Sequence, residues 1–358
     1  MEKKRRIIKM YAFIPLFYSG EKDMTIREEL EKREHEILAP WASFSDTSRG
    51  RSRQEAQCDI RPVYQRDRDR ILHTKSFRRL KGKTQVFLTP DGDHYRERMT
   101  HTLEVSQNAR TIAKALRLNE DLVEAIALGH DLGHTPFGHA GERALDRVCP
   151  EGFAHNEQSL RIVDELERSG KGLNLTAEVR DGIVNHQTRC MPFTLEGQVV
   201  RFSDKIAYIH HDMDDAIRAG ILKDDDVPGE VARVIGRTLG ERLDCLVHDI
   251  ISTSKGRDVV EMSPEVAEAM QKMRSFMYEN LYTNQVVKSE EARAEALVEA
   301  LYKYYRGRPE LLPDYLLKKE EEGASRDRIV CDFISAMTDR FAISTYQELF
   351  IPKTWTIV

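Results

Sequence analysis

Apolar residues recur every three or four positions along most of this chain, which is the spacing of one face of a helix. Residues 26–38 predict a charged helix, and residues 64–80 predict a second helix with a narrow apolar face. Further along, Val105, Ala109 and Ile112 continue the same period. The hydrophobic pattern therefore predicts an all-α fold.

Two stretches interrupt the helical pattern. Residues 43–61 are rich in Ser, Gly and Gln and carry arginines at alternate positions, which predicts a basic loop. Residues 85–89 predict a short strand, and the Pro-Asp-Gly-Asp sequence at residues 90–93 predicts the turn after it. Both stretches are expected to connect helices rather than to form a sheet.

Histidines occur on the inward stripes of two predicted helices. His101 lies one turn before Val105, and His130 lies one turn after Ile126, so both side chains are predicted to point toward the core. A single inward histidine is usually a hydrogen-bonded core residue. Several of them together favour a ligand site, because buried polar groups without partners are costly.

Carboxylates complete this pattern. The helix predicted for residues 198–218 carries Asp204, Tyr208 and Asp212 at intervals of four, so these residues share one stripe, and Asp131 directly follows the second inward histidine. Neutral nitrogen and hard oxygen ligands together suit a divalent metal with open positions. Three helices therefore supply one predicted metal site, made of His101, His130, Asp131 and Asp204.

More histidines follow the His-Asp pair. Gly133 and Pro136 are expected to end the helix, which predicts that His134 and His139 lie on a compact loop over the same site. This loop gives the site titratable groups beyond those needed for a metal. The composition and order of the residues thus predict a metal-dependent hydrolase.

Size and charge limit the other functions. The chain has 358 residues, more than one hydrophobic core usually organises, which predicts one large domain with appendages or two tightly packed domains. Its net charge is only −5, so no overall field favours nucleic acid or a membrane. Any anion must bind locally, and Arg49, Arg51 and Arg53 are candidates for binding phosphate or single-stranded nucleic acid.

Two features bear on cellular location. The five cysteines are scattered without a C-x-x-C pair, which argues against disulfides and zinc-thiolate sites and favours a reducing cytoplasm. Residues 3–17 imitate a signal peptide, but Lys9 and Pro15 interrupt the apolar run, which is also too short to span a bilayer. We expect Met24 to be the true start and residues 1–23 to be a non-native or disordered extension.

Longer motifs carry a resemblance to a known family. The order of His101, His130-Asp131 and Asp204 resembles the HD-domain phosphohydrolases, and the flanking sequence resembles the deoxynucleoside triphosphate triphosphohydrolases, the dGTPase-like group. The matching stretches are residues 77–87, 98–106, 129–142, 154–158, 203–208 and 330–340. The resemblance implies an HD-domain helical fold with additional C-terminal helices and an irregular N-terminal arm.

This resemblance also suggests how the chain is divided. After the extension, residues 24–62 form an N-terminal helix and the basic loop, residues 63–225 form the HD phosphohydrolase core, and residues 226–358 form helices that pack on it. Residues 274–282 and 302–308 mix charged and aromatic side chains, so they are expected to complete a nucleotide pocket or an oligomer interface. No residue can be assigned to reading the base.

The resemblance implies that water attacks the α phosphorus of a dNTP, either dGTP or several dNTPs, and releases a deoxynucleoside and intact triphosphate. The four metal ligands would bind a divalent ion, with Mg²⁺ or Mn²⁺ first, although iron, nickel, cobalt or zinc also suits these ligand types. Such an ion lowers the pKa of bound water and so generates the nucleophile. The family also implies an activating nucleotide in some members and a tetramer or hexamer in many.

The resemblance further implies roles for the residues around the metal. His139 matches the general acid, a role that suits histidine near neutral pH, and Glu142 matches the carboxylate that orients it. The remaining matches are His134 and His155 at the α phosphate, Arg98 and Lys205 at the phosphates, Tyr208 under the deoxyribose, and Asp212 and Gln85 at the 3′-hydroxyl.

Three other functions remain open at this point. An HD-type phosphodiesterase or nucleotidase would use two metals, with His155 and His186 as additional ligands. A guanosine tetraphosphate hydrolase would carry an acidic pair where Leu132 to Thr135 stand, so this function is disfavoured. A nucleotide sensor or a single-stranded nucleic-acid binder would retain the residues of the site without turnover.

Overall fold

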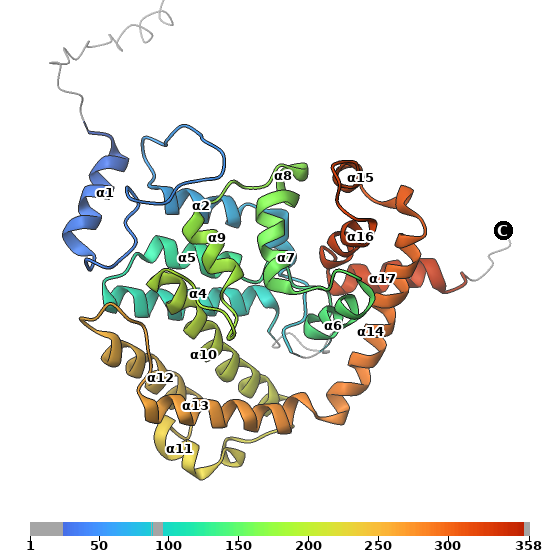
Figure 1. The fold of residues 1–358 in the computed structure, drawn as a ribbon. Helices are drawn as coiled ribbons and strands as arrows, with labels where there is room; N and C mark the ends of the chain where they lie inside the picture. Colours follow the sequence, from blue (N-terminus) through green and yellow to red (C-terminus); the bar gives the residue numbers. More distant parts are fainter. Residues whose placement is uncertain (1–23, 87, 89–95, 354–358) are drawn as a thin grey trace, which may run out of the picture.

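A computed structural model describes residues 24–86, 88 and 96–353 of the chain. Figure 1 shows that the described residues form helices connected by loops. Within these ranges the strand-like pairings are two isolated bridges, one between Arg51 and Thr176 and one between Thr84 and Glu97. The all-α prediction is therefore confirmed, while the predicted extension before Met24 and the predicted Pro-Asp-Gly-Asp turn lie outside the described residues.

Three helices at the centre of the fold carry the predicted metal ligands. α4 (Arg98–Leu116) packs against α5 (Glu120–Gly129) and α10 (Leu195–Arg218), as Figure 1 shows. The apolar residues that set the helical period form the contact, and Val105 and Ile126 are fully buried. Burying an aliphatic side chain of this size contributes about 1.5–3 kcal/mol. This packing brings the polar ends of the three stripes to one place.

The other helices surround this centre. Their bounds are α1 Ile26–Ile37, α2 Val63–Leu72, α3 Lys75–Arg79, α6 Gly138–Val148, α7 His155–Arg161, α8 Glu167–Gly170, α9 Ala177–Val184, α11 Gly229–Ile235, α12 Leu239–Ser254, α13 Pro264–Met277, α14 Gln285–Arg306, α15 Asp314–Glu321, α16 Arg326–Ser335 and α17 Asp339–Phe350. Short π-helical turns follow α7 at Ile162–Leu166 and α13 at Tyr278–Tyr282. No helix in the described ranges combines the length and hydropathy that a bilayer-spanning segment requires.

The single helix predicted for residues 64–80 is wrong, because the chain turns at Thr74. α2 ends at Leu72, and Thr74 then begins α3 by accepting a hydrogen bond at its Oγ1 from the backbone N of Phe77 at 3.0 Å. A side-chain oxygen at an N-cap satisfies an amide that has no partner within the helix. The apolar period continues across the break, so periodicity alone did not show the break.

The strand predicted for residues 85–89 is also wrong where it is described. Gln85, Val86 and Leu88 lie in bends, while Phe87 and Thr89 are outside the described residues. The short bridge between Thr84 and Glu97 takes its place. A β-branched and aromatic run without a partner strand has nothing to pair with in an all-helical fold.

The basic loop is anchored to the helical core. Arg51 forms a buried ion pair with Asp67 of α2, and Asp67 also accepts a hydrogen bond from the backbone N of Thr176 at 2.7 Å. The guanidinium of Arg49 lies 3.9 Å from the centre of the Phe193 ring. Two of the three arginines considered for nucleic-acid binding are therefore engaged in contacts within the chain.

A second hydrophobic cluster joins α6 to the C-terminal helices. α6 packs on α14, and α14 packs on α16 and α17; Figure 1 shows these four helices on one side of the molecule. Leu145, Val298 and Ile334 are fully buried in this cluster. The C-terminal helices thus lie directly beside the segment that follows the His-Asp pair.

Candidate active site

The four predicted metal ligands meet where α4, α10 and the end of α5 approach one another. His101 Nε2 lies 3.1 Å from Asp204 Oδ1. His130 Nε2 lies 3.5 Å from Asp131 Oδ1 and 3.8 Å from Asp204 Oδ1. The structure therefore brings two imidazoles and two carboxylates to one point, although they come from three helices.

The donor atoms at this point fit a divalent cation. His130 Nδ1 lies 2.7 Å from the backbone carbonyl of Ala127, which can only accept, so Nδ1 carries the proton and Nε2 carries the lone pair. That Nε2 is buried and has no hydrogen-bond partner among the described residues. A buried lone pair of this kind is costly unless a cation binds it. The His/Asp cluster is thus consistent with a divalent metal site.

Both carboxylates are kept in the ionised form that metal binding needs. Burial raises the pKa of Asp131, but the surrounding positive charges, that of Arg98 among them, oppose this effect and hold the pKa well below its usual range. Arg98 Nη1 also donates a hydrogen bond to Asp131 Oδ2 at 2.7 Å. Burial raises the pKa of Asp204 as well, and its hydrogen bond with His101 contributes most to lowering it below the ordinary value.

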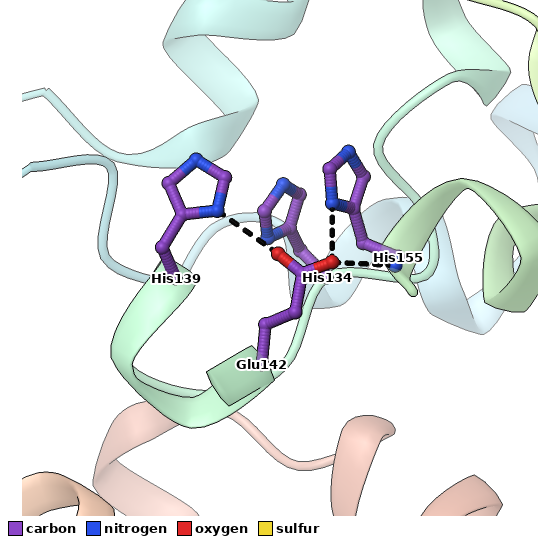
Figure 2. A group of neighbouring side chains, drawn as sticks. All are labelled: His134, His139, Glu142 and His155. Atoms are coloured by element: carbon purple, nitrogen blue, oxygen red, sulfur yellow. Dashed lines mark hydrogen bonds and ion pairs between the residues drawn. The ribbon is translucent and has the colours of Figure 1, made fainter. Parts of the chain in front are cut away.

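A second cluster of polar side chains lies beside the metal ligands, and Figure 2 shows that Glu142 stands at its centre. Glu142 Oε2 lies 2.9 Å from His139 Nδ1, and Oε1 lies 2.8 Å from both Nδ1 and the backbone N of His155. The His134 ring stacks on the His155 ring, with 4.0 Å between centroids. Burial alone would raise the pKa of Glu142, but the hydrogen bonds with both histidines lower it well below its usual range.

His139 was expected on a loop, and that placement is wrong. It lies in the first turn of α6, three residues before Glu142, so the helix itself sets the distance between the two side chains. An ionised carboxylate only accepts hydrogen bonds, so Nδ1 of His139 donates and Nε2 remains available for another group. The local helix therefore fixes both the position and the tautomer of His139.

Close backbone packing holds the segment between the two clusters. A Cβ added at Gly133 would lie 2.2 Å from the backbone N of Ser159 and 2.3 Å from the carbonyl of His155. The backbone N of Gly133 donates to Ser159 Oγ at 2.8 Å, and the Ser159 hydroxyl donates to the His130 carbonyl at 2.7 Å. Glycine at this position lets α7 lie directly against the end of α5.

A cavity of about 1050 Å³ opens onto both clusters. All the predicted site residues except His130 contribute to its lining: Gln85, Arg98, His101, Asp131, His134, His139, Glu142, His155, Asp204, Lys205, Tyr208 and Asp212. His130 lies behind them and is fully buried. The structure thus places the predicted ligands, histidines and substrate contacts around one space.

Cations gather in one part of this lining. Burial, together with the nearby charges of Arg201 and Arg274, lowers the pKa of Lys205 to about 8. Arg274, Arg189 and Lys288 also line the cavity, although none of them had been assigned to the site. Of these three residues only Arg274 lies in a segment that the sequence analysis considered, residues 274–282, whose charged and aromatic composition does not identify a single side chain.

Two tyrosines and a carboxyl form another part of the lining. The rings of Tyr208 and Tyr282 stack with centroids 5.4 Å apart, and the Tyr282 hydroxyl donates a hydrogen bond to Asp212 Oδ2. Asp212 Oδ1 and Gln85 Oε1 are buried and have no hydrogen-bond partner in the described part of the chain. Burial raises the pKa of Asp212 to about 7. Tyr282 belongs to residues 274–282, which were expected to complete a nucleotide pocket or an oligomer interface, but it was not singled out because it lies outside the periodic stripe of α10.

His186 adds a further ligand group next to the metal cluster. Its Nε2 lies 3.3 Å from His155 Nε2, and its Nδ1 lies 2.7 Å from the carbonyl of Ile183. Asp131, His155 and His186 offer ligand atoms within 4.8 Å of one another. Burial lowers the pKa of His186 to about 4, so its imidazole is neutral near pH 7 and can bind a cation.

Comparison with known families agrees with this geometry. Residues 98–209 match the HD domain, and residues 260–348 match the phosphohydrolase-associated domain. The first match begins at the first residue of α4 and ends within α10, so it contains all four clustered ligands. The second match covers the helices that pack beside α6.

Similar proteins cover nearly the whole chain. A deoxyguanosinetriphosphate triphosphohydrolase-like protein of Caldanaerobacter subterraneus subsp. tengcongensis is 53% identical over 332 residues, spanning 93% of this chain and 98% of that protein. A protein of the same description from Desulfatibacillum aliphaticivorans is 48% identical over 347 residues, spanning 92% of this chain and 99% of its own length.

A solved structure shares the fold. A phosphohydrolase from Bacteroides thetaiotaomicron aligns with a TM-score of 0.50 and 19% identity, over 78% of this chain and 67% of that one. At this identity the alignment supports the helical architecture alone. The ligand cluster, the family matches and the long alignments lead to one assignment: the chain belongs to the deoxyguanosinetriphosphate triphosphohydrolase-like family of HD-domain phosphohydrolases.

Proposed function

We propose that this protein hydrolyses deoxynucleoside triphosphates, dGTP or several dNTPs, to a deoxynucleoside and inorganic triphosphate. One observation carries the proposal: a single cavity is lined by His/Asp metal ligands, by the cluster around Glu142 and by several cations. The description of the similar proteins names a guanine deoxynucleotide as substrate. The cavity thus offers groups that suit the phosphates and the sugar of a dNTP.

The phosphates would lie against the ligand cluster and the cations. A divalent ion on His101, His130, Asp131 and Asp204, with Mg²⁺ or Mn²⁺ as first candidates, would supply Lewis-acid chemistry and activate water. Arg98, Lys205 and Arg274 line the same cavity and would offset the charge of the triphosphate. We assign the α phosphate to the region of His134 and His155, because their rings lie beside the ligand cluster.

Proton transfer would be the task of His139. The leaving 5′ oxygen needs a proton, and His139 Nε2 would deliver it while Nδ1 stays bonded to Glu142. Through this hydrogen bond the ionised Glu142 holds the His139 ring in one orientation. Glu142 therefore acts by positioning, and His139 contacts the reacting atom.

The sugar would lie at the tyrosine end of the cavity. Tyr208 would pack under the deoxyribose and exclude a 2′-hydroxyl, while Asp212 Oδ1 and Gln85 Oε1 would accept a hydrogen bond from the 3′-hydroxyl. Both oxygens are buried without partners among the described residues, so a donor from the substrate would satisfy them. We also propose a homo-oligomer, a tetramer or hexamer, and an activating nucleotide, because the family implies both.

The decisive experiment incubates the purified protein with each dNTP and NTP in the presence of Mg²⁺ or Mn²⁺ and separates the products. Deoxynucleoside with intact triphosphate is the expected result. Monophosphate with pyrophosphate would refute the proposed bond cleavage, and no product from any mixture would favour a nucleotide sensor. Sedimentation with and without each dNTP would test the proposed assembly and activation.

A second candidate is an HD-type phosphodiesterase or nucleotidase with two metals. The group of Asp131, His155 and His186 favours it, because two imidazole nitrogens face each other next to the first ligand cluster. Metal analysis of the purified protein distinguishes the two functions. One equivalent per chain fits the triphosphohydrolase, and two equivalents lost together in a His186→Ala variant would support the second candidate.

A further inference from the structure

Two C-terminal helices, α16 and α17, contact the active site through buried polar groups and contribute no residue to the cavity lining. Ser335 ends α16 and Asp339 begins α17. Facing them are Lys83 and Thr84, which immediately precede the cavity residue Gln85. Neither Lys83 nor Asp339 lines the cavity. Both belong to sequence motifs that provide no metal ligand.

Lys83 links two segments by its side chain. Only 2% of it is exposed, and its Nζ donates hydrogen bonds to the backbone carbonyl of His134 and, at 2.7 Å, to that of Ser335. A buried ammonium is expensive unless its protons are accepted. These carbonyls accept two of its protons, so Lys83 ties the segment after the His-Asp pair to the end of α16.

Asp339 joins the segment of residues 82–84 to the turn that precedes His139. Its Oδ2 accepts hydrogen bonds from the Thr84 hydroxyl and, at 2.9 Å, from the Thr84 backbone N. Its Oδ1 accepts one from the backbone N of Phe137 at 2.9 Å, and its own backbone N donates to the Gly82 carbonyl at 2.9 Å. With donors on both oxygens, the carboxylate has one orientation.

The backbone that Asp339 holds is strained. Phe137 has a φ of +64° and Gly138 a φ of +56°, and both residues come immediately before His139. A non-glycine residue in this left-handed region costs on the order of 1–3 kcal/mol and persists only when its surroundings hold it. The hydrogen bond from the Phe137 backbone N to Asp339 is a direct restraint on this turn.

We propose that Lys83 and Asp339 are positioning residues, which act through the backbone of His134 and Phe137 to aim His139 at the substrate. The inference rests on the proposed function for its catalytic part. It assigns a role to the phosphohydrolase-associated region, residues 260–348, which contributes Ser335 and Asp339. The C-terminal helices thus hold the proton-transfer segment in place as well as covering α6.

The test is Asp339→Asn, which keeps the shape but turns one acceptor oxygen into an amide donor. That donor must face either Thr84 or Phe137, so one restraint is lost. We expect kcat for dNTP hydrolysis to fall by about 30- to 100-fold, because a displacement of about 1 Å can cost that much. KM and bound metal should change little, since the phosphate contacts and ligands lie elsewhere.

Asp327→Asn is the matched control. Asp327 lies on α16 and pairs with Arg306 Nε at 2.6 Å and with the Tyr302 hydroxyl, so the same substitution removes an ion pair outside the cavity. Its kcat should equal that of the wild type. Lys83→Met serves as a second test variant if Asp339→Asn does not fold, and it should show the same loss of kcat at nearly constant KM.

Two readouts do not depend on turnover. Amide hydrogen exchange over residues 133–142 should be faster in both test variants and unchanged in the control, and the ¹⁵N signals of the His139 ring should shift in the same variants. A folded Asp339→Asn protein with wild-type exchange, ring signals and kcat would refute the inference, as would an effect on KM alone. If the wild type releases no triphosphate while exchange responds as expected, the proposed function fails and the positioning role stands.

Discussion

Glu142 shows how one carboxylate can set the state of two histidines on different elements. It accepts hydrogen bonds from Nδ1 of His139 within its own helix and of His155 at the start of α7. Because Nδ1 donates in both cases, each ring presents Nε2 to other groups. A single ionised residue thus fixes two tautomers and joins the proposed proton donor, His139, to the proposed phosphate contact, His155.

At Tyr208 we predict a loss of sugar discrimination. Tyr208→Ala removes the ring that would pack under the deoxyribose, so the ratio of kcat/KM for dGTP to that for GTP should fall at least about tenfold, the scale of one lost packing contact. Parallel assays with the two nucleotides measure this ratio. An unchanged preference for deoxynucleotides would show that another residue excludes the 2′-hydroxyl.

At Asp212 we predict a pH-dependent cost to stability. Burial raises its pKa from 3.8 to about 7, so the folded state binds more protons than the unfolded state between these values. Burial disfavours the ionised form of this carboxyl in the folded state. The free energy of unfolding therefore falls as pH rises through this window, and it is lowest above the folded pKa. Relative to Asp212→Asn, the wild type should lose about 2 kcal/mol between about pH 5 and about pH 8.

Urea unfolding of both proteins at the two pH values measures this difference. Asp244→Asn, at a surface carboxylate of α12, serves as the control and should remain parallel to the wild type. A constant difference between wild type and Asp212→Asn across the pH range would contradict the assignment. Since Asp212 is also the proposed contact for the 3′-hydroxyl, the Asn variant should be more stable near neutral pH and bind substrate less tightly.

Among the elements, the contact between α7 and the end of α5 depends on Gly133. A methyl group there would overlap two backbone atoms of the first turn of α7, and neither can move without displacing His155. We expect Gly133→Ala to lower the free energy of unfolding by about 2 kcal/mol or more and to reduce kcat. Chemical denaturation and steady-state kinetics of the same preparation measure both effects.

Gly240 provides the matched control on α12. A Cβ at Gly240 meets nothing within 4 Å, so Gly240→Ala should stabilise the protein by about 0.5–1 kcal/mol through helix propensity, without any change in kcat. If both alanine variants behaved alike, close packing at Gly133 would not be the reason for glycine there. The comparison separates the steric overlap at Gly133 from the general effect of replacing a helical glycine with alanine.

For the whole molecule, metal binding should couple to unfolding. The ligands come from α4, the end of α5 and α10, which are separated in the sequence, so the unfolded chain holds no preformed site. At about 100 times its Kd, an ion should add about 2.7 kcal/mol to the free energy of unfolding. Calorimetry with EDTA and then with added Mn²⁺ should show a lower and then a restored Tm.

His101→Ala is the control for this prediction. It removes one ligand from α4, so the response of Tm to Mn²⁺ should shrink strongly. An equal response in the variant would place the bound ion away from this cluster. Metal analysis of both proteins gives the number of ions per chain, which also tests the two-metal alternative.

The apolar period and the residues at helix ends were sufficient to predict much of the helical architecture from the sequence. The helices predicted at residues 26–38 and 198–218 are confirmed with small changes at their ends, because their apolar stripes and caps are local features. The break at Thr74 and the bends after Thr84 were not predicted. At Thr74 the N-cap hydrogen bond overrode the helical period, and after Thr84 no partner strand was available among the described residues for the β-branched and aromatic run.

The sequence by itself determined the all-α class, the family and the types of the candidate ligand residues, since helical period and motif order are written in neighbouring residues. Only the tertiary structure decided that Glu142 joins two histidines, that Tyr282 and Arg274 line the cavity, and that Lys83 and Asp339 hold the turn before His139. The contact between Glu142 and His155 joins residues 13 positions apart, and that between Lys83 and Ser335 joins residues 252 positions apart. Local patterns carry no information on such distances, which are set by how the helices pack.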